Sequence, residues 1–232
     1  MEDTDQITAP YRRPTPDRPL LGLTVLVVED SRYASESLRL MCLHSGARIR
    51  RADCLASARR HLKVYRPSAA IVDLGLPDGS GLGLIRDMAA ARPRIGVILA
   101  TSGDDTTGPS ARAAGADDFL AKPLDSLATF QHAILSHLPP DRQPRGVRPV
   151  RNDRVVPDPI ALRDDLAHAA DVLAQHPDRQ TIGYVAHFLQ GIAHSTGDTT
   201  LAEVASDLTT PGGDPQKIAR RLQELAQNGR AI

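Results

Sequence analysis

The sequence contains no tryptophan, and it has only four tyrosines and three phenylalanines among its 232 residues. Proteins that bind single-stranded nucleic acid stack the bases on aromatic side chains, so a chain with so few is not expected to bind single strands in that way. Net charge is also absent, because 28 Lys and Arg balance 28 Asp and Glu. This balance argues against a protein that depends mainly on electrostatic attraction to nucleic acid.

Cysteine is scarce as well. The two cysteines, Cys42 and Cys54, do not have the spacing of metal ligands and suit a reducing compartment, where buried thiols behave as small apolar side chains. No run of about 18 apolar residues is present, and the N-terminus lacks the charged-then-apolar pattern of a signal peptide. We therefore expect a soluble cytoplasmic protein that does not interact with a membrane.

The length exceeds the commonest domain size, which favours two domains. Residues 1–19 contain four prolines and little to bury, so they are predicted to be a flexible tail. A pattern of alternating strands and helices covers 20–138. Residues 139–157 contain five prolines and five arginines, which is typical of a semi-rigid linker. Its arginines are interpreted as solvated, with a basic strip for an acidic partner as the alternative. Residues 158–232 carry only helical spacing.

The first apolar run, residues 23–28 (LTVLVV), is β-branched and too short for a helix. It predicts a buried parallel strand, and it is followed directly by Glu29 and Asp30. The carboxyl ends of such strands form the edge at which open α/β sheets bind ligands. Two adjacent carboxylates repel each other unless a hard cation lies between them. Mg²⁺ is the usual cation at such a site, because it prefers oxygen ligands.

Two further short apolar runs each lead to a polar residue, 69–72 to Asp73 and 95–100 to Thr101, and a fourth short candidate strand, 117–120, is followed by Ala121 and Lys122. Together the strand ends bring three acids, a hydroxyl and an ammonium group to one edge of the sheet. That set is suited to phosphorylation of a carboxylate. Asp73 would be the nucleophile, the three acids would hold Mg²⁺, and Thr101 and Lys122 would contact the phosphoryl oxygens.

Helical spacing lies between these strands. It predicts helices near 32–45, 54–65, 81–91, 106–114 and 124–137, with one more strand near 47–52. Five alternating strands and helices imply a parallel sheet that is covered on both faces. The predicted fold class is α/β, flavodoxin-like (βα)5, with strand order 2-1-3-4-5 and the site between the first and third strands.

Residues 22–138 resemble the receiver domain of two-component response regulators. The resemblance rests on Glu29-Asp30, on the segment DLGLPDGSG at 73–81, on Thr101-Ser102 and on Lys122-Pro123. Their separations also match: 43 residues from Asp30 to Asp73, 28 to Thr101 and 21 to Lys122. A single acid pair after a strand would be weak support, but the whole set in register is specific.

The resemblance implies a role for each of these residues. Asp73 would be the phosphoacceptor, and Mg²⁺ would be bound by Glu29, Asp30, Asp73 and the carbonyl of Gly75. Thr101 and Lys122 would stabilise the phosphoryl group, and Thr101 with Phe119 would form a switch. The Lys122–Pro123 peptide bond would be cis. Such a domain can lose its phosphoryl group by hydrolysis, and no dedicated catalytic activity is expected.

Apolar residues recur at helical spacing four times after residue 158, around 162–173, 182–192, 201–208 and 218–225. This pattern predicts a small all-α domain similar to a four-helix bundle. Six basic residues stand against ten acidic ones between 158 and 232, a net charge of −4. We therefore expect no DNA binding, because a DNA-reading helix needs an exposed basic face.

One exposed helical face carries the most informative residues of this half. Ile182, Val185, Leu189 and Ile192 share the apolar face, so that His187, Gln190 and Gly191 fall opposite. The segment HFLQG at 187–191 resembles the histidine-containing phosphotransfer domain, whose signature is His, any residue, Leu, Lys, Gly. The sequence departs from it at Gln190, which can donate a hydrogen bond but lacks the charge of lysine.

The two resemblances indicate a response regulator of a phosphorelay, with a sensor histidine kinase or a phosphotransfer protein as its partner. Three hypotheses stay open for the helical half. It can relay phosphoryl groups through His187. It can be a degenerate phosphotransfer domain that docks on a kinase or receiver and modulates it without carrying phosphate. It can also be an unrecognised nucleic-acid-binding output domain. The oligomeric state and the cognate kinase stay open.

Overall fold

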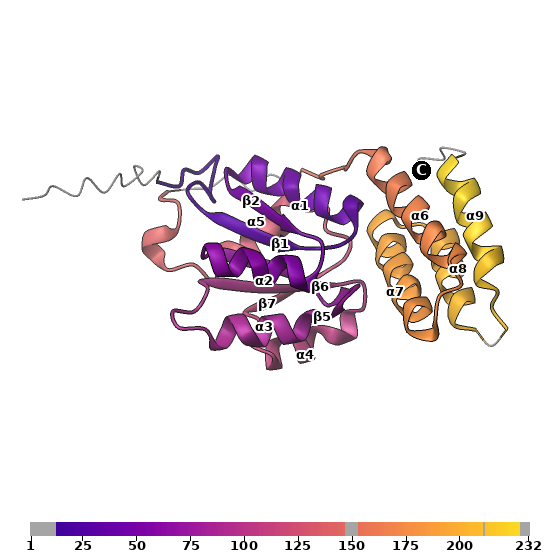
Figure 1. The fold of residues 1–232 in the computed structure, drawn as a ribbon. Coiled ribbons are helices and arrows are strands. Elements are labelled where there is room, and N and C mark those ends of the chain that lie inside the picture. Colours follow the sequence, from indigo (N-terminus) through magenta and orange to yellow (C-terminus); the bar gives the residue numbers. More distant parts are fainter. Residues whose placement is uncertain (1–12, 147–152, 211, 228–232) are drawn as a thin grey trace, which may run out of the picture.

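The computed structural model describes residues 13–146, 153–210 and 212–227, which form an α/β unit (24–135) and a helical unit (159–227) (Figure 1). The outermost part of the predicted tail (1–12), the middle of the predicted linker (147–152) and the end of the chain (228–232) lie outside the described residues. Among the described residues, no helix is long and apolar enough to cross a membrane.

Five parallel strands form the sheet of the α/β unit, in the order β2-β1-β3-β6-β7. They are β1 (Thr24–Val28), β2 (Arg48–Ala52), β3 (Ala69–Asp73), β6 (Val97–Ser102) and β7 (Asp118–Ala121). The predicted flavodoxin-like order 2-1-3-4-5 is thus confirmed. A small antiparallel hairpin, β4 (Gly75–Leu76) with β5 (Gly79–Ser80), was not predicted, because strands of two residues are too short to show a pattern.

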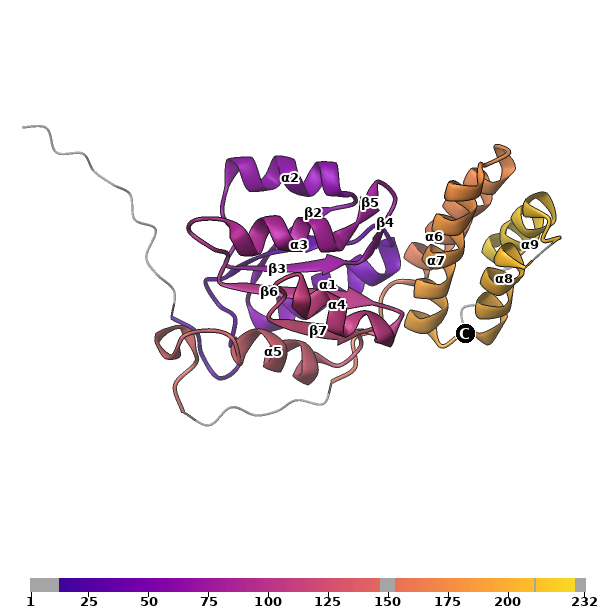
Figure 2. The same cartoon turned by 90° about the horizontal axis from the view of Figure 1, so that it is seen from below.

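Helices cover both faces of this sheet (Figure 2). On one face lie α1 (Arg32–Ser45) and α5 (Leu127–Leu135); on the other lie α2 (Leu55–Val64), α3 (Gly81–Ala90) and α4 (Gly108–Ala113). Short 3₁₀ turns precede α4 (η1, Asp105–Thr107) and follow α5 (η2, Pro140–Arg142). Because both faces are covered, the central strands read as continuous apolar runs; residues 25–28 of β1 are fully buried.

The register of the sheet fixes which residues meet at its carboxyl edge. Val28 of β1 pairs with Val72 of β3, so the acid pair and Asp73 leave neighbouring strands at the same level. Asp73 in turn pairs with Thr101 of β6. The last pair between β6 and β7 involves Ala121, so that Lys122 follows at the same edge. The residues of the predicted site are therefore neighbours.

Segments on either side of the α/β unit also pack against it. Thr15 and Arg18 form a hydrogen-bonded turn, and the backbone N–H of Leu20 donates to Ser45 at the end of α1. Val155 donates its backbone N–H to Asp125 and is buried in the core beside α5. The structure thus places 13–19 and 153–155 on the α/β unit, in regions where a flexible tail and a linker were predicted.

The helical unit consists of α6 (Pro159–Ala174), α7 (Arg179–Thr196), α8 (Thr199–Thr209) and α9 (Pro215–Gln227), which share one hydrophobic core. Each of the four predicted helical segments lies within one of them. The Asp158 side chain caps α6, with Pro159 at its first position, and Gly197 ends α7 in the left-handed conformation. Helices α6 and α7 lie against the carboxyl edge of the sheet, and α8 and α9 lie on the far side (Figures 1 and 2).

Candidate functional site

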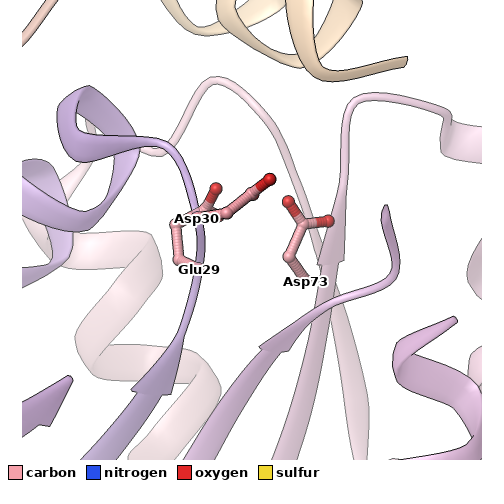
Figure 3. Close-up of side chains that lie close together, drawn as sticks. All are labelled: Glu29, Asp30 and Asp73. Atoms are coloured by element: carbon pink, nitrogen blue, oxygen red, sulfur yellow. The ribbon is translucent and has the colours of Figure 1, made fainter. Parts of the chain in front are cut away.

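Three carboxylates converge where β1 and β3 end (Figure 3). Glu29 and Asp30 follow β1, and Asp73 is the last residue of β3. Each offers an oxygen, and these oxygens lie within 4.8 Å of one another. The acid cluster predicted from the strand ends is therefore present.

Lys122 balances part of this negative charge. Its Nζ lies 2.7 Å from Oδ2 of Asp73 and 2.9 Å from Oε2 of Glu29, and its side chain is only 3% exposed. The Lys122–Pro123 bond that precedes the next loop is cis, as predicted. One ammonium group thus contacts two of the three carboxylates.

Burial and the neighbouring charges shift the pKa values of these groups. Burial, reinforced by repulsion from Asp73, raises the pKa of Glu29 well above its usual value. The same two causes raise the pKa of Asp30 to about 7. Burial alone would lower the pKa of Lys122, but Asp73 and Glu29 outweigh it and hold that pKa above its ordinary value. Three carboxylates and one ammonium leave an excess of negative charge. Their oxygens therefore fit a divalent cation that takes oxygen ligands.

Two further predicted residues lie close by. Thr101 is fully buried, and within the described part of the chain its hydroxyl has no hydrogen-bond partner. Phe119 is half-buried, and a Cβ atom at Gly108 of α4 would lie 3.4 Å from its ring. Gly75 donates its backbone N–H to Oδ1 of Asp73 at 3.2 Å. The switch role of Thr101 and Phe119, and the Gly75 carbonyl as a metal ligand, stay predictions.

Comparison with known proteins identifies the α/β unit. A protein-family model described as "Response regulator receiver domain" matches residues 25–134. These residues form a response regulator receiver domain. Receiver domains bind Mg²⁺ at their acidic site, and the cluster of Glu29, Asp30 and Asp73 is consistent with such a site. Partners of receiver domains are histidine kinases or phosphotransfer proteins.

Curated relatives match about 100 residues of the chain. The chain is 34% identical over 100 residues to the KDP operon transcriptional regulatory protein KdpE of Escherichia coli K12, covering 43% of this chain and 44% of the relative. It is 34% identical over 103 residues to the virulence transcriptional regulatory protein PhoP of Salmonella typhimurium, covering 44% of this chain and 46% of the relative. The match thus spans less than half the length of either relative. A solved structure of a putative response regulator from Chloroflexus aurantiacus is 29% identical, with a TM-score of 0.46, and covers 49% of this chain and 98% of that one.

The helical unit lies against this acidic site of the receiver. The imidazole of His187 rests on Gly75, where a Cβ atom would overlap with its Cδ2 and Nε2 atoms. Gly75 is two residues beyond Asp73, and His187 and Asp73 line the same small cavity. The rest of the His187 side chain remains exposed toward a groove that Gln190 also lines.

A second contact involves Gly191 on the same helix. A Cβ atom at Gly191 would lie 3.7 Å from Nζ of Lys122. Across the interface, a Cβ atom at Gly103 would lie 3.3 Å from both Cα of Gly191 and Nδ1 of His194. Because Gly191 on α7 and Gly103 in the loop that follows β6 have no side chains, α7 can approach this loop closely.

The cavity that Asp73 shares with His187 measures about 10 Å³, room for about one water molecule. Its lining includes Asp73, Lys122, His187 and Gly191. Asp73 itself is only 4% exposed. The helical unit therefore covers the acidic site of the receiver.

Two interface residues were missed by the sequence analysis. The phenol of Tyr184 donates a hydrogen bond to Oδ2 of Asp30 at 2.7 Å, and burial together with Asp30 raises the pKa of Tyr184. Asp165 of α6 is 2% exposed and contacts the start of α1. A signal for Asp165 exists: it stands three residues after Leu162 and four before Ala169, the spacing of a buried helix face.

Proposed function

We propose that the protein is a response regulator in which Asp73 of the receiver and His187 of the helical unit exchange a phosphoryl group within one molecule. The observation that carries this proposal is the contact of the His187 ring with Gly75, beside the acidic site. A histidine that only faced solvent would not need a receiver glycine beneath its ring. In this proposal the helical unit acts as a four-helix domain of the phosphotransfer type.

In this proposal Asp73 first receives a phosphoryl group from a sensor histidine kinase or a phosphotransfer protein. The lone pair of Nε2 of His187 then attacks the phosphorus, a P–N bond forms, and the bond between phosphorus and the Asp73 oxygen breaks. The carboxylate of Asp73 is restored, and the reverse step returns the group. Mg²⁺ held by Glu29, Asp30, Asp73 and the Gly75 carbonyl would neutralise charge on the phosphoryl oxygens.

Lys122 and Thr101 supply the remaining contacts. The ammonium of Lys122 can follow the phosphoryl group, because it lies between Asp73 and the surface of Gly191. It provides the positive charge that Gln190 lacks, since a charged donor binds an anionic oxygen about twice as strongly as a neutral one. The buried hydroxyl of Thr101 has no partner of its own among the described residues and is free to donate to a phosphoryl oxygen.

A second candidate function is a modulator that docks without carrying phosphate. The observation that favours it is the narrow space between Asp73 and His187: the cavity that both line measures about 10 Å³, so a phosphoryl group requires the units to separate slightly. In that case the helical unit would regulate access to Asp73, and His187 would serve only as a contact.

We favour a helical unit that acts by contact with other proteins over one that binds DNA. The curated relatives are named transcriptional regulatory proteins, but their match covers less than half of this chain and less than half of each relative. The helical half carries ten acidic and six basic residues, and its α6–α7 face is engaged with the receiver. Steeply salt-dependent DNA binding by the full chain would restore the third hypothesis.

The proposal is tested by phosphorylation with purified sensor kinases of the source organism, using the wild-type chain, Asp73→Ala and His187→Ala. Label entering the wild type and His187→Ala, but not Asp73→Ala, supports Asp73 as the entry point. Label that enters Asp73→Ala at the wild-type rate contradicts it. Phosphate on His187 in the wild type separates the relay from the modulator.

A further inference from the structure

Asp165 is a buried carboxylate that the phosphoryl chemistry does not use. It lies on α6, and its side chain contacts the first residues of α1 in the receiver. Oδ1 accepts a hydrogen bond from the backbone N–H of Arg32 at 2.8 Å. Oδ2 accepts from the hydroxyl of Ser31 at 2.8 Å and from the backbone N–H of Tyr33 at 3.0 Å. A residue of one unit thus caps a helix of the other, 134 residues away in sequence.

This contact completes the start of α1. The first N–H groups of a helix have no partner within the helix. Ser31 serves one of them itself, because its hydroxyl oxygen accepts from the backbone N–H of Ala34 at 3.0 Å. The proton of the same hydroxyl is then free for Asp165, which also takes the N–H groups of Arg32 and Tyr33. Ser31 and Asp165 therefore match as donor and acceptor.

Charge makes this match selective. Burial raises the pKa of Asp165, and the hydrogen bonds from Tyr33, Arg32 and Ser31 act against that rise. A buried carboxylate without such donors is strongly unfavourable. Beside it, Asp164 forms an exposed ion pair with Arg32 at 2.5 Å. Such a surface pair contributes little energy, but it places opposite charges on the two units at this contact.

We propose that Asp165 is the specificity-determining residue of this interface, and that it dedicates the helical unit to the receiver of its own chain. It does so by requiring a hydroxyl donor at position 31 together with the two free N–H groups of α1. A receiver with an acidic residue there would repel it, and docking would fail. The inference rests on the proposed function, because this contact holds α7, with His187, over Asp73.

The first test measures amide hydrogen exchange in the full chain without phosphate. Asp165→Asn should speed exchange at the N–H groups of Arg32 and Tyr33 on the order of tenfold, since hydrogen bonds to a charged group are lost. Asp171→Asn is the matched control, because Asp171 is an exposed acid on the same helix. Unchanged exchange in Asp165→Asn would overturn the proposal.

A swap tests selectivity. Ser31→Asp keeps a good cap for α1 but faces Asp165 with a like charge. It should enlarge the radius of gyration in small-angle X-ray scattering, because the units separate. The double variant Ser31→Asp with Asp165→Asn should be compact again, since the new amide can donate to the new carboxylate. A Ser31→Asp chain as compact as the wild type, or a double variant that stays expanded, would contradict the assignment.

Dilution decides whether the receiver belongs to the same chain. Compactness that is independent of protein concentration supports docking within one chain. Compactness that is lost on dilution would assign the contact to a second copy and overturn that part of the proposal. Neither the hydrogen-exchange measurement nor the scattering measurement involves phosphate. If docking behaves as stated and His187 is never phosphorylated, the relay fails while the role of Asp165 stands.

Discussion

The imidazole of His187 lies directly on Gly75, the second residue after Asp73. The contact depends on glycine, because a Cβ atom at position 75 would overlap with the edge of the ring that carries Nε2. Phosphoryl transfer requires the attacking and leaving atoms to be aligned within a narrow range. We therefore expect phosphoryl transfer to be sensitive to small changes in the pairing of these two residues.

Gly75→Ala should displace His187 while leaving the charged groups of the receiver intact. We expect transfer from Asp73 to His187 to slow by about 10²-fold, the cost of a misplacement of about 1 Å. Phosphorylation of Asp73 itself should change much less. Single-turnover kinetics measure both steps. Gly83→Ala is the control, since a Cβ atom at Gly83 would have no neighbour within 4 Å. Equal transfer rates in both variants would refute the role of Gly75.

Gly191→Arg should separate the two units. A single methyl group fits at position 191, but a long cationic side chain would meet the Lys122 ammonium and the loop at Gly103. We expect a larger radius of gyration, loss of transfer to His187 and faster labelling of Asp73 by a small phosphodonor. Gly183→Arg on the same helix faces open space and should leave all three unchanged. If Gly191→Arg behaves like that control, the docking face lies elsewhere.

Asp30→Asn should stabilise the metal-free protein and remove most of the stabilisation that Mg²⁺ provides. Without Mg²⁺ the variant should gain about 1–2 kcal/mol in unfolding free energy at neutral to mildly alkaline pH. The reason is that the ionised Asp30 is disfavoured in the folded state by burial and by repulsion from Asp73. Saturating Mg²⁺ should stabilise the wild type, by about 2.7 kcal/mol at one hundred times its Kd, and the variant far less. Urea unfolding with Mg²⁺ or EDTA measures this. A wild type that Mg²⁺ does not stabilise would contradict the predicted metal site.

Thr101→Val tests the predicted switch. The buried hydroxyl makes no hydrogen bond among the described residues, so its loss should not destabilise the unphosphorylated protein and can add about 1 kcal/mol. Affinity for beryllofluoride, a phosphoryl mimic, should fall about tenfold, because Val cannot donate. Thr209→Val, at an exposed site on α8, is the control.

In the wild type, beryllofluoride should also move Phe119 inward. A structure with the mimic bound and Phe119 unmoved would refute the switch.

Much of the receiver is predictable from the sequence, because its determinants are local. The strands β1, β3 and β6 are short apolar runs, and the polar residues of the site lie at or just after the ends of their strands, so Asp73 and Lys122 could be placed before their contact was known. The parallel order then requires that these ends meet at one edge. The ion pair between Lys122 and Asp73 follows from that arrangement.

The interface between the units is not predictable in the same way. His187 could be identified as an exposed residue from the helical pattern, but nothing near it in the sequence points to Gly75. Asp165 and Ser31 are 134 residues apart, and each has an ordinary local context as a helical acid and a helix cap. Only packing of the two units shows that one completes the other. Tyr184 is similar, since its partner Asp30 lies 154 residues earlier.

The chemical stability of phosphate on the full chain distinguishes phosphorylation of Asp73 from phosphorylation of His187. The wild-type protein is incubated with Mg²⁺ and acetyl phosphate, then divided between acid and base. We predict an acyl phosphate on Asp73 together with an acid-labile, base-stable phosphate on His187. The second should be absent from both His187→Ala and Asp73→Ala. A wild-type protein that is phosphorylated on Asp73 and never carries the base-stable phosphate would contradict it.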